Sequence, residues 1–217
     1  MITAYGACHA RAKACFAILL FMFGLAIPAR AEILVLVLGD SLSAGYGLAR
    51  GEGFQPRLTE ALTNAGLRQV RLVDAAVSGD TTAGGRARLA WAMGNGVDAA
   101  IVELGANDGL RGVDLRAMEA NLTAILDDLA AKGIPVLLTG MHAPPNMGAD
   151  YAHAFHDVFR RLGTRSGVIF DPFFLEGVAG DPALNLPDRI HPNAAGIQRI
   201  VTRILPLVQR LVIEAGK

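Results

Sequence analysis

Charged residues are scarce in this 217-residue sequence, and neither sign of charge prevails. They make up 18% of the chain, and 20 basic side chains match 20 acidic ones, so the formal net charge is zero. A nucleic-acid partner needs a basic surface, so we expect none. Disorder and collagen-like repeats are also excluded, because 52% of the residues are hydrophobic. The length suits a single domain.

The N-terminal segment carries the parts of a secretory signal peptide. Two basic residues precede the apolar run 14–27, which is too short to span a bilayer comfortably, and Ala29-Arg30-Ala31 matches a small-x-small cleavage site. We predict a signal peptide over residues 1–31, removed after Ala31, and one domain over residues 32–217. The alternative is an uncleaved N-terminal anchor.

Cysteine is almost absent, and both copies, Cys8 and Cys15, lie inside the predicted signal peptide. The mature chain would have no thiol, which excludes disulfide bonds, thiol catalysis and cysteine-ligated metals. Removing three basic residues and no acidic one leaves 17 basic and 20 acidic groups, a formal charge of −3. We expect a periplasmic or secreted protein without a stable membrane anchor.

The remaining sequence alternates short, β-rich apolar runs with helical patterns, which is typical of a parallel sheet with crossover helices. The first run is almost continuously apolar, as expected of a central strand covered on both faces. The predicted strands are 33–38, 70–75, 99–104, 135–139 and 168–170.

Two helices are clear from their apolar periodicity. Apolar side chains recur at positions 118, 122, 125 and 129, which predicts a helix over 115–132, and a second stripe predicts a helix over 197–212. Pro206 is expected to kink or divide this second helix. The stretch 171–192 is rich in Pro, Asp and Gly and lacks any period, and loops of that length are usually functional.

Polar residues follow the ends of the predicted strands, where the chemistry of such a sheet collects. In GDSLSAGYG, residues 39–47, Ser41 lies at a strand-to-helix turn that would expose its hydroxyl, although a helix N-cap is the simpler role. After the next two strands, the Gly79 amide can approach a ligand closely and the Asn107 side chain can donate to an oxyanion. Either residue alone is also an ordinary turn residue.

The segment DRIHPN, residues 188–193, supplies an acid three residues before a histidine. Asp188 can orient the imidazole of His191 while the other ring nitrogen faces a serine, although a lone pair of this kind is more often a surface contact. The chain order Ser, Asp, His is one of several known for the same triad geometry. Because all these segments follow strand ends or open the last helix, we expect them to meet.

The four blocks GDSLSAGYG, SGDTTAGG, ELGANDGLRG and DRIHPN together resemble the SGNH hydrolases, also called the GDSL esterase and lipase family. The resemblance covers residues 33–211 and is strongest to the exported bacterial arylesterase and acyl-CoA thioesterase/lysophospholipase group. It implies a flavodoxin-like, three-layer α/β/α sandwich with five parallel strands. It also implies Ser41, Asp188 and His191 as the catalytic residues, and the amides of Ser41 and Gly79 with the Asn107 side chain as the oxyanion hole. No metal and no cofactor are implied.

The resemblance implies hydrolysis of aryl and acyl esters, and of acyl thioesters or lysophospholipids. A carbohydrate acetylesterase of the same family is the alternative, although the single tryptophan, Trp91, leaves few aromatic platforms for sugar rings. The segment 108–112 resembles the mobile switch loop of the thioesterase relatives. For the two acids in the site blocks we expect structural roles: Asp40 would bond loop amides, and Asp108 would cap the helix after its turn.

Three rival classes remain at this point. Glycines 45, 47 and 51 follow a strand as in dinucleotide-binding proteins, but their spacing and position are wrong. A zinc site is conceivable because four possible ligands have spacings that fit one helix face, namely Asp150, His153, His156 and Asp157. The third class is a binding module that keeps the fold without the chemistry.

Overall fold

Five parallel strands form one sheet in the computed structural model, which describes residues 32–217. The predicted signal peptide lies outside the described residues. In space the strands follow the order β2-β1-β3-β4-β5. Each predicted strand is confirmed, with ends that agree to within one residue. Their bounds are β1 (Ile33–Gly39), β2 (Val70–Ala76), β3 (Ala99–Glu103), β4 (Val136–Thr139) and β5 (Val168–Asp171).

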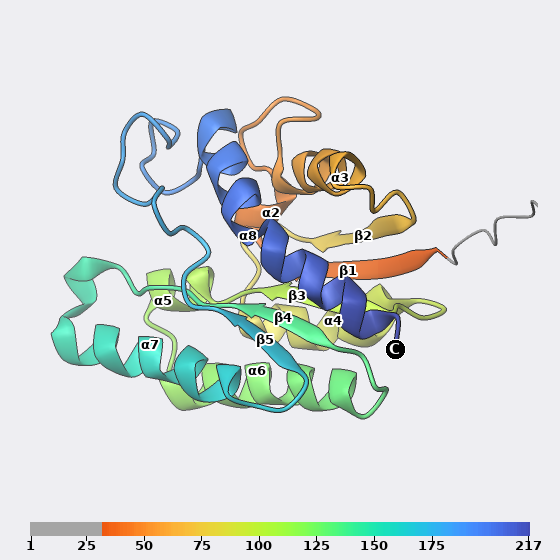
Figure 1. The fold of residues 1–217 in the computed structure, drawn as a ribbon. Helices are drawn as coiled ribbons and strands as arrows, with labels where there is room; N and C mark the ends of the chain where they lie inside the picture. Colours follow the sequence, from red (N-terminus) through yellow and green to blue (C-terminus); the bar gives the residue numbers. More distant parts are fainter. Residues whose placement is uncertain (1–31) are drawn as a thin grey trace, which may run out of the picture. The chain divides into compact units, whose positions relative to one another are not determined.

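Helices cover both faces of this sheet (Figure 1). The helices α3 (Phe54–Asn64) and α8 (Ala194–Ala215) pack together on one face. The other face carries α4 (Thr82–Met93), α6 (Leu115–Ala130) and α7 (Ala149–Gly163). This arrangement confirms the predicted three-layer α/β/α sandwich. Within residues 32–217, no helix is long and apolar enough to cross a membrane.

Both predicted helices are present, with ends set by capping residues. The carboxylate of Asp114 accepts hydrogen bonds from the first amides of α6, and the side chain of Asn193 does the same for α8. Pro206 lies inside α8 without dividing it, so the expectation of a divided helix is wrong. Ile204 and Val208 belong to the apolar stripe of α8, lie on either side of Pro206 in the sequence, and are both buried. Their packing holds the helix together.

Short helices follow the carboxyl ends of three strands: α2 (Ser41–Ala44), α5 (Ala106–Arg111) and the 3-10 turn η1 (Pro145–Met147). The segment 108–112, expected to be a loop, is instead the end of α5 and its cap Gly112. The backbone at Gly112 is left-handed, with φ of 60°, which ends the helix.

The predicted long loop 171–192 consists of turns with one isolated bridge, between Asn185 and Pro192. Its beginning is fixed by Arg203 of α8, which forms an ion pair with the buried Asp171 and donates to two backbone carbonyls. The loop therefore leaves the carboxyl edge of β5 from a fixed point and returns to the first turn of α8. Asp188 and His191 lie on this return.

Candidate functional site

The turn between β1 and α2 places Ser41 at the carboxyl edge of the sheet. Asp40 is the N-cap of α2, and its Oδ1 accepts a hydrogen bond from the Leu42 amide at 3.0 Å. Only glycine fits at position 39, because a Cβ there would lie 2.0 Å from the Ser43 hydroxyl oxygen. The tight turn leaves Ser41 as the first residue of a four-residue helix, with its side chain partly exposed.

Ser41, His191 and Asp188 form one continuous hydrogen-bonded chain. The Oγ of Ser41 lies 2.9 Å from Nε2 of His191, and Nδ1 of His191 lies 2.7 Å from Oδ2 of Asp188. A carboxylate can only accept, so Nδ1 carries the hydrogen and Nε2 is free to accept from the serine hydroxyl. The structure therefore brings together the three residues predicted as catalytic, from the start of α2 and from the loop before α8.

Asp188 is fixed by its own loop as well as by the imidazole. Its Oδ1 accepts hydrogen bonds from the amides of Ile190 at 2.9 Å and His191 at 3.0 Å. This fold-back requires a left-handed backbone at Arg189, with φ of 61°. Desolvation raises the pKa of Asp188, but these two amides and the His191 side chain outweigh it and hold the pKa at about 2. The Asp188 carboxylate is therefore charged at neutral pH, where it can stabilise a protonated His191 imidazole.

The two other predicted oxyanion donors follow the strands on either side of β1. Gly39, the last residue of β1, is in register with Ala76 of β2 and Glu103 of β3, so the segments beyond them leave the sheet at the same edge. This is the topological switch point, where parallel sheets of this order bind ligands. The Asn107 side chain contacts the Ser41 turn directly, since its Nδ2 donates to Oδ2 of Asp40 at 3.0 Å.

Gly79 has a left-handed backbone, with φ of 83°, and its carbonyl is held by α5. Nη2 of Arg111 donates to that carbonyl at 2.8 Å. The same short helix therefore carries Asn107 and anchors the peptide of Gly79. Arg111 was missed from the sequence because it resembles any exposed arginine at a helix end.

Two buried acids lie under the Ser41 turn, and the sequence interpretation considered only one of them. Glu103 is fully buried at the end of β3, and its Oε2 accepts a hydrogen bond from the Asp40 amide at 3.3 Å. Burial raises the pKa of Glu103 well above its ordinary value, and the neighbouring charge of Asp40 raises it further. Burial also raises the pKa of Asp40 to about 6, although hydrogen bonds from Leu42 and Asn107 oppose the shift. A single acid inside an otherwise apolar strand was the signal that could have identified Glu103.

Arg88 of α4 is a second residue that sequence reasoning missed. Its guanidinium donates to the carbonyls of Ala75 and Gly39 and forms an ion pair with Asp80 at 2.6 Å. It therefore ties together the ends of β1 and β2 beside the site. Asp40 has the structural role that we expected, but its Oδ1 accepts from the Leu42 amide of α2, as a helix N-cap, and not from loop amides.

Asp108 caps a helix as we expected, but it caps a different helix from the one that follows its turn. Asp108 lies within α5, and its carboxylate accepts from the amide and hydroxyl of Thr82, at 2.9 and 2.6 Å. It therefore caps the first turn of α4 instead of its own helix.

The rival zinc and nucleotide readings gain no support. In the part of the chain that the structure describes, no three His, Cys, Asp or Glu side chains converge as metal ligands do. The four residues suggested as zinc ligands lie on α7. Gly45 ends α2 and Gly47 lies in the turn that follows, both with positive φ.

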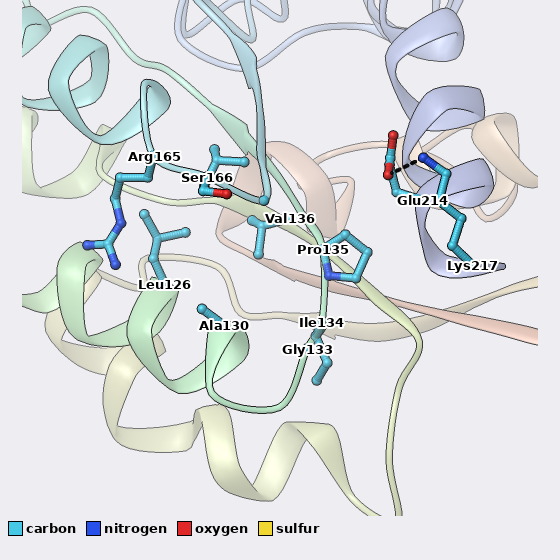
Figure 2. A pocket seen from close by; sticks show the side chains of 12 residues that line it. Leu126, Ala130, Gly133, Ile134, Pro135, Val136, Arg165, Ser166, Glu214 and Lys217 are labelled. Carbon is cyan, nitrogen blue, oxygen red and sulfur yellow. Dashed lines mark hydrogen bonds and ion pairs between the residues drawn. The ribbon is translucent and has the colours of Figure 1, made fainter.

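A pocket at the opposite edge of the sheet is separate from this site (Figure 2). Val136 and Val168, which line it, are the first residues of β4 and β5, whereas the candidate catalytic residues follow the last residues of the strands. An ion pair between Glu214 and Lys217 borders the pocket.

Known proteins are similar to this chain in sequence and in fold. The model of the GDSL-like Lipase/Acylhydrolase family matches residues 37–199. Esterase TesA of Pseudomonas aeruginosa is 38% identical over 179 residues, 82% of this chain and 89% of the relative. Thioesterase 1/protease 1/lysophospholipase L1 of Escherichia coli (strain K12) is 37% identical over 175 residues, 80% of this chain and 82% of the relative.

A solved structure of a protein with the name of the first relative has a similar fold. A crystal structure of TesA matches with a TM-score of 0.78 and 37% identity, covering 82% of this chain and 99% of that one. The residues that the family model matches, 37–199, include the β1–α2 turn and the other segments that form the site described above. The chain belongs to the GDSL-like lipase/acylhydrolase family, the SGNH hydrolases.

Proposed function

We propose that this ester hydrolase works through an acyl enzyme on Ser41, with His191 as the general base and acid. The observation that carries the proposal is the hydrogen-bonded chain from Ser41 through His191 to Asp188. His191 Nε2 takes the hydroxyl proton as Oγ attacks the carbonyl carbon of the ester. The bond to the alcohol or thiol then breaks, and His191 returns the proton to that leaving group.

Water completes the cycle. His191 takes a proton from the water as it attacks the acyl carbon, the bond to Oγ breaks, and the proton returns to Ser41. Asp188 keeps the imidazole in the tautomer that accepts at Nε2 and stabilises the imidazolium formed in each step. The released product is a carboxylic acid.

We assign the oxyanion hole to the amides of Ser41 and Gly79 and the side chain of Asn107. Such donors stabilise the developing negative charge, each by on the order of 2 to 4 kcal/mol. Support comes from the register of Gly39 with the strands that precede the other two donors, and from the contact of Asn107 with the Ser41 turn.

For the substrate we propose aryl and acyl esters, together with acyl thioesters or lysophospholipids. Relatives at this level of identity carry the names esterase and thioesterase/lysophospholipase. The carbohydrate acetylesterase alternative has less support, because sugar sites use aromatic platforms and the single tryptophan lies elsewhere. Trp91 is 84% exposed near the C-terminal end of α4, whereas the other end of that helix, at Thr82, is the one that contacts Asp108 of α5.

We also propose that residues 1–31 act as a cleaved export signal, so that the domain 32–217 works in the periplasm or outside the cell. This proposal rests on the sequence pattern alone. Mass spectrometry of the protein purified from periplasm or medium tests it. A mature N-terminus at Glu32 is the expected result, and an intact N-terminus on exported protein contradicts it.

Hydrolysis of p-nitrophenyl esters from acetyl to palmitoyl tests the catalytic proposal. Ser41→Ala should abolish turnover, and Ser166→Ala, a serine at the opposite edge of the sheet, is the matched control that should keep it. Equal activity in wild type and Ser41→Ala refutes the serine mechanism. A medium-chain optimum supports the thioesterase and arylesterase class, whereas activity confined to acetyl esters favours the carbohydrate acetylesterase.

A further inference from the structure

The side chain of Asp40 is buried and makes no contact that the ester-hydrolysis steps above use. Both of its oxygens nevertheless accept hydrogen bonds, Oδ1 from the Leu42 amide at 3.0 Å and Oδ2 from Nδ2 of Asn107 at 3.0 Å. The first bond caps α2. The second links the turn of the nucleophile to the side chain assigned to the oxyanion hole.

A side-chain amide can face a partner in two ways that have nearly the same shape. In one, its NH₂ group donates, and in the other, its oxygen accepts; the partner decides between them. A carboxylate has no hydrogen to give, so Asp40 in its charged form admits only the orientation in which Asn107 donates. One hydrogen of Nδ2 is then bound to Asp40, and the second is left for another acceptor.

We propose that Asp40 is a positioning residue for ester hydrolysis: its carboxylate selects the orientation of the Asn107 amide that presents an N–H to the oxyanion. The inference rests on the proposed roles of Ser41 and Asn107. With the amide reversed, Oδ1 of Asn107 would face the developing oxyanion and repel it. Asp40 acts through Asn107 and touches no reacting atom.

The role requires the charge to lie on Asp40 and the proton on its buried neighbour. Glu103 lies beside Asp40 and is fully buried; among the described residues its Oε1 finds no hydrogen-bond partner. An ionised carboxylate with a bare buried oxygen is far more costly than a neutral acid there. Each oxygen of Asp40 accepts an N–H, whereas one oxygen of Glu103 accepts none, so Asp40 is the better place for the one negative charge.

Other charged groups face Asp40 from each element around it. Asp80, after β2, opposes its ionisation, and His191, before α8, favours it. Arg88 of α4 pairs with Asp80 and binds the carbonyl of Gly39, the residue before Asp40. Because the pKa of Asp40 is about 6, mild acid protonates it. A protonated Asp40 can donate to Oδ1 of Asn107, and the selection is lost.

A double-variant cycle on the full chain tests the proposal, with kcat and KM measured on a p-nitrophenyl ester. We expect Asp40→Asn to lower kcat by roughly tenfold to a hundredfold with KM little changed, because an amide at position 40 can accept or donate. Asn107→Ala should lower kcat by about a hundredfold or more. In the Asn107→Ala background, Asp40→Asn should cost less than about twofold, because the residue it orients is gone. Asp128→Asn, on the exposed side of α6, is the matched control.

A multiplicative effect in the double variant overturns the proposal, since Asp40 would then act through the cap of α2. The pH profile gives a second measurement should Asp40→Asn fail to fold. On the acid side, kcat of wild type should fall through an extra titration near pH 6 that Asn107→Ala lacks, and identical acid limbs overturn the proposal. Full activity in Asn107→Ala or Ser41→Ala would instead show that the catalytic assignment fails, and the inference about Asp40 would fall with it.

Discussion

Replacing the buried Glu103 by glutamine should change how the stability of the protein depends on pH. Burial and the charge of Asp40 raise the pKa of Glu103 well above 4.5 in the folded chain, whereas the unfolded chain ionises normally. Above pH 4.5 the folded state therefore holds a proton that the unfolded state has released. The part of the wild-type free energy of unfolding that is linked to the Glu103 proton is fully present below that pH. It is lost as pH rises toward the folded pKa of Glu103, by about 1 kcal/mol per pH unit.

Glutamine at position 103 cannot ionise and should remove this slope. Its oxygen can still accept from the Asp40 amide, while its NH₂ group would occupy the side where Oε1 has no partner among the described residues. An unsatisfied amide there lowers stability by about 1 to 3 kcal/mol at every pH. The diagnostic quantity is therefore the difference in slope between the two proteins, and not the offset.

Urea unfolding between pH 7 and pH 8 measures that slope above the titration of Asp40, whose pKa is about 6. Over this range, the free energy of unfolding of Glu103→Gln should rise relative to wild type by about 1 kcal/mol for each pH unit in which Glu103 keeps its proton. Glu60→Gln, on the exposed side of α3, is the matched control and should follow the wild-type curve. Parallel curves for Glu103→Gln and wild type would show that Glu103 is ionised in the fold, against the reasoning above.

Two further predictions concern the triad and the packing. Asp188→Asn should lower kcat by up to about ten-thousandfold, because an amide can favour the wrong tautomer of His191, and steady-state kinetics with an unchanged kcat would contradict the assigned role. Gly163→Ala, at the end of α7, should destabilise the fold by about 1 to 3 kcal/mol, because the new Cβ would lie 2.4 Å from the Phe170 ring. Urea unfolding measures the change, and a stability equal to wild type would show that the ring moves aside freely.

Much of the fold could be predicted because its signals are local. The strands are short apolar runs between glycines and polar turns. The helices α6 and α8 begin directly after Asp114 and Asn193, whose side chains accept hydrogen bonds from the first helical amides. Of the two effects expected of Pro206, a kink or a division, the division does not occur, because propensity is a local term whereas α8 is held by burial of its whole apolar stripe. The segment 108–112 misled the prediction because two glycines resemble a loop, although Gly109 is buried inside α5.

The candidate site divides in the same way. Ser41, Asp188 and His191 lie in recognisable blocks, and the structure places them within hydrogen-bond reach of one another. Arg88 and Arg111 could not be found, because each acts on backbone carbonyls that only the folded sheet brings near. Asp108 was recognised as a cap but assigned to the wrong helix for the same reason, since its partner Thr82 belongs to another crossover.

Glu103 shows why the register of the strands carries information that motifs do not. A lone acid in an apolar strand is anomalous in the sequence, but its meaning depends on what lies opposite. Here the opposite residue is Gly39, whose missing side chain leaves the space for the Glu103 carboxyl, because a Cβ on Gly39 would lie 2.8 Å from its Oε2. The glycine that allows the turn of Ser41 therefore also admits the acid beneath it, and the two are one structural unit. A larger residue at position 39 should displace the acid together with Ser43, so the turn of Ser41 and the buried carboxyl of Glu103 must change together.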